Sequence, residues 1–517
     1  MPWKRLAVAA LLAVTLIVPA IAAAEGPPRD TPWPTKGWET STPEAQGLDS
    51  GRLARLVEQV GQGKQDSLLI VRHGRIVVDA YYAPYAPGIR HDLRSVTKSV
   101  TGTLIAVALN NGALDRVDHP VVDLFAGRAI DNLDDRKRAM TVQHLLDMAS
   151  GIAWQERNYT PDETVMRMYQ SKDRAEFVLN QPMAAAPGTK FDYNSGDSHL
   201  LSAIISKQTG LGVLEYAQRE LFAPLGIGDV NWGRPDATGI RDGSANLALA
   251  PHDMAKIGYL YLHRGRWEGR QIIPPEWADR AADGPVAAPP NYHYANQWWS
   301  IPEKDAYMAR GRHSQLILVL PKLDIVAAMT GSLRDDEFYA VRRLIDDIAA
   351  AVRSDDAVPD DTAAQSLLAA AIRSAAVERP SARGEAPPLA AAISGKTYRF
   401  ARNNLQLESF ALNLVGANPS WEFTIPATRE RPARTFGGPL GLDGAFKTSS
   451  PSEHGIDAVK ARWADGRTLE VERRILGHSD VQLWRLAFDG GKVVVNFENT
   501  DGFKSEVRGE QAEHAAQ

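Results

Sequence analysis

The stretch Ser95–Gly112, SVTKSVTGTLIAVALNNG, decides the fold of this chain. Its second half is almost wholly apolar and closes on the stop signal NNG, so we predict a buried helix. Its polar residues gather at the beginning, where the polar stretch His91–Arg94 gives way to the apolar run. The helix therefore begins with Ser95-Val96-Thr97-Lys98, the single Ser-x-x-Lys of the sequence.

The spacing of Ser95 and Lys98 indicates nucleophilic catalysis. Positions i and i+3 share one face of a helix, so the Lys98 amine can reach the Ser95 hydroxyl. Desolvation at the start of so apolar a segment favours the neutral form of an amine, which can accept a proton. The helix N-terminus also presents backbone N–H groups where an oxyanion would develop. The local pattern alone equally fits a capping serine and a lysine whose ammonium reaches solvent.

Strand signals lie on both sides of a long helical region. The runs Ser67–Arg72 and Arg75–Tyr82 follow a helix expected near Gly51–Val60. Helix and loop patterns dominate residues 115–284, and strands are predicted again at Gln315–Leu320 and Ile325–Thr330, before a helix over about residues 336–352. We therefore expect an α/β (α+β) fold, in which one antiparallel sheet built from both ends of this region is flanked by helices and carries an all-helical insert.

Four parts are expected along the chain. Lys4 and Arg5 precede an apolar run that ends in alanines, which predicts a signal peptide over residues 1–24 and export to the periplasm or the medium. An uncleaved anchor helix is the alternative. Residues 25–352 form the domain described above, and residues 393–511 an antiparallel β-domain. Between them, residues 353–392 are expected to be an Ala- and Pro-rich linker with room for one short helix. No later stretch is long and apolar enough to span a membrane, so stable insertion is not expected after cleavage.

Composition narrows the chemistry. The chain of 517 residues has a formal net charge of −5, which offers no electrostatic footprint for nucleic acid. Cysteine is absent, which excludes thiol nucleophiles, disulfides and Cys-ligated zinc. The His-Glu-x-x-His of many zinc hydrolases and the Gly-x-Ser-x-Gly elbow of α/β-hydrolases are absent as well. We expect no metal and no cofactor.

Further motifs accompany the Ser-x-x-Lys group. Ser95–Gly102, SVTKSVTG, resembles the first box of the β-lactamase and penicillin-binding superfamily. HLLDMASG at His144–Gly151 resembles its HLL-x-x-x-SG segment, PGTKFDY at Pro187–Tyr193 resembles the approach to its second box, and Leu247–Leu262 is similar to a later helix. The similarity extends from about residue 37 to residue 352. It is nearest to the class C-like serine hydrolases, in the branch of 6-aminohexanoate-dimer hydrolases and carboxylesterases.

The second box departs from the class C pattern. That pattern is Tyr-x-Asn, whereas this chain has Tyr193-Asn194-Ser195, similar to the Tyr-x-Ser of the dimer-hydrolase branch. The resemblance makes Tyr193 the partner of Lys98 in handling the proton of the nucleophile, because a phenol beside an ammonium loses its proton more readily. A core aromatic with a satisfied hydroxyl is the alternative.

The third box departs further. Many relatives have Lys-Thr-Gly, and this chain has Ala309-Arg310-Gly311-Arg312 before a strand. The resemblance implies that Gly311 keeps the strand open to substrate and that the Arg312 backbone N–H is the second oxyanion donor, beside that of Ser95. His313 follows on the expected strand, either polarising substrate or facing solvent.

We therefore expect a serine hydrolase that cleaves an amide or ester of a small or peptide-like substrate through an acyl-enzyme. Its site consists of Ser95 with Lys98 and Tyr193 as general base and acid, and of Ser195, Gly311 and Arg312 at oxyanion or substrate positions. The missing Asn and Lys count against β-lactamase activity. A catalytically weak protein that binds cell-wall peptide is the alternative, as are a D-amino-peptidase and a β-lactamase proper. Four aromatic residues either line the cleft or pack in the core: Tyr292, Tyr294, Trp298 and Trp299.

Overall fold

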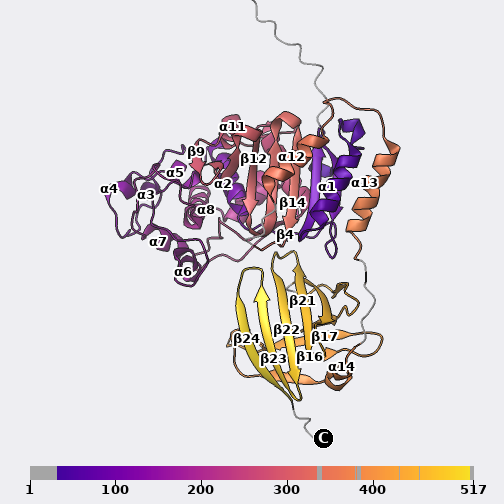
Figure 1. Cartoon of the computed structure of the whole chain (residues 1–517). Helices are drawn as coiled ribbons and strands as arrows, with labels where there is room; N and C mark the ends of the chain where they lie inside the picture. The colour runs from indigo at the N-terminus through magenta and orange to yellow at the C-terminus, as the bar shows by residue number, and fades with distance from the viewer. Residues whose placement is uncertain are drawn as a thin grey trace, which may run out of the picture.

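The computed structural model describes residues 32–334, 340–378, 380, 386–429, 431–452 and 455–512. The predicted signal peptide, residues 1–24, lies outside these ranges. The chain forms two domains, which lie one below the other in Figure 1. No helix within the described ranges combines the length and the apolar character that crossing a membrane requires.

The first domain is built on a nine-stranded sheet of order β1-β3-β2-β14-β13-β12-β11-β10-β9. Its neighbouring strands are antiparallel except for the parallel pair β1 and β3. The strands are β1 (Glu39–Thr40), β2 (Gln65–Arg72), β3 (Arg75–Tyr81), β9 (Val286–Ala288), β10 (Tyr292–Ala295), β11 (Trp298–Ile301), β12 (Ala306–Gly311), β13 (Gln315–Leu320) and β14 (Ile325–Gly331). The antiparallel sheet predicted from both ends of the domain is confirmed.

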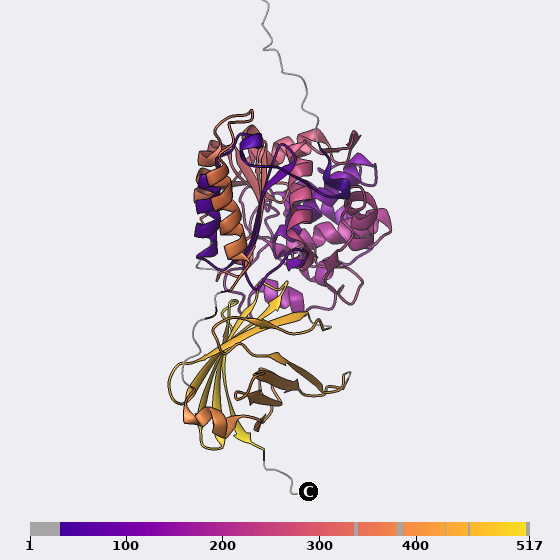
Figure 2. The same ribbon diagram turned by 90° about the vertical axis from the view of Figure 1, so that its right-hand side faces the viewer.

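Helices cover both faces of this sheet, as the two views in Figures 1 and 2 show. One face packs against α1 (Ser50–Gly61), α12 (Val341–Ala351) and α13 (Thr362–Ala375). The other packs against α2 (Val96–Asn110), α10 (Pro251–Leu262) and α11 (Pro275–Asp283). All eight residues of β2 are buried, because alternate side chains enter opposite cores: Leu68 and Ile70 on the first face, Leu69 and Val71 on the second.

An insert of helices and loops lies between α2 and α10. Its longest helix, α8, packs against α2, α5 and α7. A small sheet of order β4-β6-β5 ties the end of the insert to the segment just before α2. The elements are β4 (His91–Asp92), α3 (Val121–Leu124), α4 (Asp135–Arg138), α5 (Val142–Leu146), α6 (Thr164–Gln170), α7 (Arg174–Leu179), α8 (Ser195–Thr209), α9 (Val213–Ala217), β5 (Asn231–Trp232) and β6 (Leu247–Leu249); a hairpin of β7 (Arg266–Trp267) and β8 (Arg270–Gln271) follows α10.

The sheet differs from the prediction between α11 and β13. We predict strands again only from Gln315, whereas the structure already has four strands, β9 to β12, between Val286 and Gly311. Three of these strands, β9 to β11, are only three or four residues long. So short a strand cannot display the alternation of apolar and polar residues by which strands are predicted.

Residues 353–392 hold two helices, where the sequence predicts a linker with one short helix. Within them, Thr362–Ala375 form α13, which packs against α1 and contributes Leu368 and Ala371 to the core of the first domain. Alanine-rich sequence fits a linker, but it equally forms a helix whose small side chains permit close packing. Pro388–Ile393 form α14, which packs in the core of the second domain.

The second domain is a ten-stranded antiparallel sheet of order β18-β17-β16-β15-β24-β23-β22-β21-β20-β19. The sheet encloses a core of aromatic and branched side chains, among them Tyr398, Phe410, Trp421 and Val495. Its strands are β15 (Thr397–Phe400), β16 (Ser409–Asn413), β17 (Ser420–Ile425), β18 (Arg434–Pro439), β19 (Lys447–Thr448), β20 (Ile456–Trp463), β21 (Thr468–Leu476), β22 (Val481–Asp489), β23 (Lys492–Asn499) and β24 (Lys504–Gln511). The predicted C-terminal β-domain is confirmed as an antiparallel sheet.

Candidate active site

Ser95 stands between the short strand β4 and the apolar helix α2. It is half-buried and caps the N-terminus of α2, with φ −71° and ψ −4°. The turn before it is anchored to β6, because the Leu93 N–H donates to Leu247 O at 2.8 Å. Arg94 lies between the two with a φ of 48°, a left-handed conformation that costs free energy in a residue other than glycine. The candidate nucleophile therefore follows a strained residue.

Lys98 lies one turn into α2 and contacts Ser95. Its Nζ donates to Ser95 Oγ at 3.1 Å and to Ser244 O at 3.0 Å. The ring of Tyr193 lies on a third side, with its centroid 4.9 Å from Nζ. The side chain is only 2% exposed, and none of the ion pairs found among the described residues involves it. An amine held against a hydroxyl without a carboxylate partner is arranged to exchange a proton with that hydroxyl.

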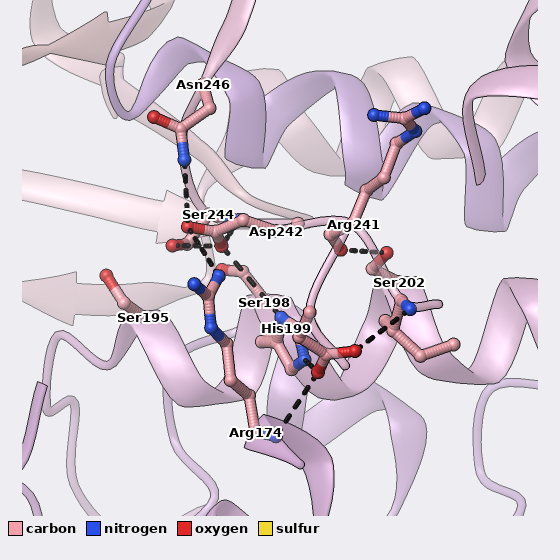
Figure 3. Close-up of polar contacts among 12 residues, drawn as sticks. Arg174, Ser195, Ser198, His199, Ser202, Arg241, Asp242, Ser244 and Asn246 are labelled. Carbon is pink, nitrogen blue, oxygen red and sulfur yellow. Dashed lines mark hydrogen bonds and ion pairs between the residues drawn. The ribbon is translucent and has the colours of Figure 1, made fainter. Parts of the chain in front are cut away.

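A buried polar network behind the lysine fixes Ser244 (Figure 3). Asp242 Oδ1 accepts hydrogen bonds from Ser244 N at 2.8 Å and from Ser244 Oγ at 2.7 Å. The ring nitrogens of His199 lie 4.0 Å from Asp242 and 3.7 Å from Asp236, and burial lowers the pKa of this histidine. The network thus holds the carbonyl group that the lysine binds. Within the described part of the chain, no group of three or more His, Cys, Asp or Glu side chains is arranged to hold a metal ion.

Tyr193 comes from the loop before α8, and the HLLDMASG segment holds this loop. Asp192 donates its N–H to Met148 O at 2.8 Å. Gly151 has a φ of 79°, and a Cβ there would lie 2.5 Å from a backbone oxygen of the same loop, so the position requires glycine. On the other side, the Tyr193 ring stacks on Trp299 of β11, with centroids 5.8 Å apart. The segment at 144–151 therefore acts on the site by positioning the tyrosine.

Ser195 faces the protein interior. It is 1% exposed, and its Oγ and N donate to the carboxylate of Glu156 at 2.5 Å and 2.8 Å. Asn194 caps α8, with its side-chain oxygen accepting from Gly196 N at 2.7 Å. Both residues therefore organise the start of α8. The predicted contact of Ser195 with substrate finds no support in this arrangement.

Strand β12 ends against the turn that carries Ser95. Its last residue, Gly311, pairs with Gln315 of β13. A Cβ at Gly311 would lie 2.4 Å from Leu93 O and 3.0 Å from Ser95 N, so only glycine permits this approach. We expect this glycine to keep the strand open to substrate, and the structure adds that its lack of a Cβ permits close approach to the turn at Leu93–Ser95. Arg312 follows directly, so its N–H is attached to the residue that meets the Ser95 turn.

The turn between β12 and β13 corrects the prediction for His313. The residue lies in a tight turn formed by Arg312–Ser314, not on a strand, and has a φ of 62°. It is fully buried, with Nδ1 2.7 Å from Leu333 O and Nε2 3.0 Å from Asp501 Oδ1. Asp501 belongs to the C-terminal domain, so the pattern of a single strand could not reveal this contact.

The four aromatic residues predicted for cleft or core divide between the two. Tyr294 and Trp298 are buried, with 1% and 0% exposure, and belong to the core. Tyr292 and Trp299 are half-buried, and their ring centroids lie 5.7 Å apart. Because Trp299 also stacks on Tyr193, this pair lies beside the candidate proton donor.

Sequence reasoning missed Tyr159, in the loop between α5 and α6. The Arg312 guanidinium lies 4.3 Å from the centroid of the Tyr159 ring. The phenol donates to Glu156 Oε1 at 3.1 Å, and burial together with this carboxylate raises the pKa of Tyr159. Its loop carries no motif, so no local signal could have identified the residue.

Comparisons with known proteins place these residues in a family context. A family model described as Beta-lactamase matches residues 53–351, a range that contains every site residue above except Asp501. The chain is 25% identical over 311 residues to the 6-aminohexanoate-dimer hydrolase of Paenarthrobacter ureafaciens, covering 55% of this chain and 77% of the relative. It is 26% identical over 166 residues to the monacolin J acid methylbutanoyltransferase of Aspergillus terreus, covering 28% of this chain and 39% of that protein.

Among solved structures, a Bacillus anthracis protein provisionally named as a 6-aminohexanoate-dimer hydrolase has a similar fold. The TM-score is 0.52 at 21% identity, covering 62% of this chain and 89% of the other. This likeness supports the fold assigned to the first domain.

Proposed function

The chain belongs to the beta-lactamase family and is a serine hydrolase, and we propose that it cleaves an amide or ester through an acyl-enzyme on Ser95. The observation that carries the proposal is the 3.1 Å contact between Lys98 Nζ and Ser95 Oγ at the start of α2. The relatives named as a dimer hydrolase and a methylbutanoyltransferase are compatible with transfer of an acyl group.

Acylation begins when Ser95 Oγ attacks the carbonyl carbon of the substrate. Lys98 in its neutral form takes the hydroxyl proton across the existing contact. The carbonyl oxygen becomes an oxyanion, which accepts hydrogen bonds from the backbone N–H groups of Ser95 and Arg312 in our assignment. When the bond to the leaving alcohol or amine breaks, Tyr193 supplies the proton that this group needs and regains one from Lys98. The product is the acyl-enzyme.

Deacylation uses the same groups in reverse. A water molecule attacks the acyl carbon and gives its proton to the pair formed by Lys98 and Tyr193, and Ser95 Oγ recovers a proton as it leaves. In the protein without substrate, the lysine contacts the ring of the tyrosine. Catalytic hydrogen bonds often tighten only in the substrate complex, so this ring contact is compatible with a hydroxyl that engages the nucleophile later.

The site favours substrates that lack the charged groups of a lactam antibiotic. Ser195 stands where class C enzymes have asparagine, and its side chain is occupied by Glu156. No Lys-Thr-Gly occurs in the chain, so the usual third-box lysine is missing. Tyr292 and Trp299 supply half-buried aromatic surface beside Tyr193. We therefore propose a linear amide or ester with an apolar group next to the scissile bond.

Covalent labelling tests the proposal. A fluorophosphonate probe should attach to Ser95, as peptide mass spectrometry can establish, and S95A should lose both label and turnover. The melting temperature of S95A should stay near that of the wild type, because only one half-buried hydroxyl is lost. As a matched control, S99A removes a hydroxyl one turn further along α2, where it donates to Gln297 O at 2.6 Å, and should still be labelled.

Activity of S95A within about tenfold of the wild type would exclude Ser95 as nucleophile, because removing such a group costs several powers of ten. A wild-type protein that binds cell-wall peptide but takes no label would favour the non-catalytic alternative.

We also propose that the protein is exported, on the basis of its N-terminal segment. N-terminal sequencing of the protein from cell fractions tests this. A chain that begins just after Ala24 in the periplasm or medium supports cleavage, whereas an intact N-terminus in the cytoplasm contradicts export.

A further inference from the structure

The C-terminal domain is docked on the segment that leads to the nucleophile. Its β21–β22 turn accepts a hydrogen bond from Asp92 N to Gly477 O at 2.7 Å. A Cβ at Gly477 would lie 2.4 Å from Arg90 O, so the two backbones are in direct contact. Nearby, Arg474 of β21 has a side chain only 12% exposed and lies 3.8 Å from the buried carboxylate of Asp66 in β2. The docking therefore consists of close-packed backbone and a buried pair of opposite charges.

A second turn of the same domain reaches the candidate active site. Asp501, between β23 and β24, accepts from His313 Nε2 at 3.0 Å and lies 3.5 Å from Arg312 Nη1. Its other oxygen lies 3.4 Å from Arg94 Nη2. Arg94 Nε also donates to Ser479 Oγ of the neighbouring turn at 2.8 Å. One carboxylate thus joins the residue before the nucleophile to the turn after Gly311.

Asp501 is ionised in this setting. Burial alone would raise the pKa of its carboxyl group, but the hydrogen bond from His313 and the charges of Arg94 and Arg312 hold that pKa well below its usual range. The side chain is 32% exposed, so solvent screens these interactions only in part.

Both segments that Asp501 contacts have strained backbones. Arg94, His313 and Ser314 have φ values of 48°, 62° and 74°. Such conformations cost free energy in a non-glycine residue and persist only where the surroundings hold them. The contacts of Asp501 are therefore placed where they stabilise the two turns that carry the Ser95 and Arg312 N–H groups.

We propose that Asp501 is a positioning residue through which the C-terminal domain completes the hydrolase site, by fixing the Arg94 turn and the Arg312–Ser314 turn relative to each other. This inference rests on the proposed function, because it assigns the two N–H groups to one oxyanion. It also gives the C-terminal β-domain a role in catalysis.

The test compares D501A, D501N and E498Q in the full-length protein. Glu498 is the matched control, because it lies on β23 and crosses the same interface to Arg334 at 2.8 Å. Its other ion pair is with Lys504 of β24 and not with the turn at residues 312–314. The readouts are kcat and KM for a p-nitrophenyl ester and the rate at which a fluorophosphonate labels Ser95. Circular dichroism and thermal unfolding check that each variant is folded.

We expect D501A to lower kcat and the labelling rate about 100-fold, because misplacing catalytic groups by about 1 Å has an effect of that size. KM should change less than about threefold. D501N should lose less than D501A, because an amide oxygen still accepts from His313. E498Q should keep its rates within about twofold of the wild type, because Glu498 pairs with Arg334 and Lys504 and with neither Arg94 nor Arg312.

Equal losses in E498Q and D501A would mean that Asp501 only docks the domain, and this would overturn the inference. Wild-type rates in D501A would do the same. If D501A does not fold, D501N decides: a folded D501N with wild-type rates contradicts the positioning role. The failure of the proposed function has a different signature, namely wild-type protein that turns over ester without label on Ser95.

Discussion

Replacing Gly311 with alanine should displace the nucleophile turn. The φ of Gly311 is −125°, which alanine adopts without strain, so the cost arises from contacts alone. The new Cβ would meet Leu93 O at 2.4 Å, Ser95 N at 3.0 Å and Arg94 Cβ at 3.2 Å. Because ordinary van der Waals contact begins at 3.4 Å, the ends of β12 and of the Ser95 turn must separate by about 1 Å.

This separation affects stability and rate differently. Forcing a methyl group into packed structure costs about 1–3 kcal/mol of unfolding free energy. A misplacement of about 1 Å lowers the rate about 100-fold. We therefore expect G311A to unfold at a lower temperature, and to lose about 100-fold in kcat/KM for p-nitrophenyl esters while it remains folded at 25 °C.

A glycine in open surroundings provides the control. Gly228 lies in an exposed loop outside the left-handed region, and a Cβ there would have no atom within 4 Å, so G228A should match the wild type in both assays. If G311A keeps kcat/KM within about threefold of the wild type, β12 does not set the position of Ser95, and the oxyanion pair assigned to Ser95 and Arg312 fails with it.

Three further predictions concern the site and the stability of the protein. Lys98→Ala and Tyr193→Phe should each lower kcat by a factor of hundreds or more. The double variant should be little worse than the poorer single variant, because groups that act as a unit are non-additive. If the two losses multiply in the double variant, Lys98 and Tyr193 have separate roles. Nitrocefin should be hydrolysed far more slowly than p-nitrophenyl esters, and equal rates would contradict the specificity argued from Ser195. Burial lowers the pKa of His263 to about 4, so the unfolded chain takes up a proton between about pH 6.5 and pH 4 that the native state does not. The free energy of unfolding should therefore fall as the pH is lowered through this window, and H263F should reduce that fall. Denaturant titrations at several pH values measure it, and the same pH dependence in H263F and the wild type would contradict the prediction.

The parts of the fold that can be predicted from sequence are those with a local signal. Helix α2 follows from a long apolar run and its NNG stop. The predicted start at Ser95 lies one residue before the observed start at Val96, and the helix ends at Asn110, within the stop signal. Strand β13 occupies the predicted residues, Gln315–Leu320. The packing of α13 on the first domain was not foreseen beyond one short helix in a linker, because its alanine-rich sequence buries only a narrow stripe against α1. Short strands such as β10 were missed because four residues show no period.

The candidate site divides in the same way. Ser95 and Lys98 lie three residues apart on one helix, so their contact follows from helical geometry. The partner on the other side of the amine, Ser244, lies 146 residues away from Lys98, and its carbonyl group carries no sequence signal. Asp501 lies 188 residues from His313, in a different domain. Tertiary folding alone brings such residues together.

The position of Asp501 bears on what the functional unit of this chain is. The family match ends at residue 351. The turn beside Gly311 is nevertheless held by the carboxylate of Asp501, which lies 150 residues beyond the end of that match. A strained turn does not maintain itself, since each left-handed non-glycine residue favours relaxation. In this protein the restraint comes from Asp501 of the second domain, with Ser479 as a further anchor on Arg94. In our proposal the first domain supplies the nucleophile and its base, and the second holds the geometry in which they act. The proposal therefore makes both domains necessary for a complete site.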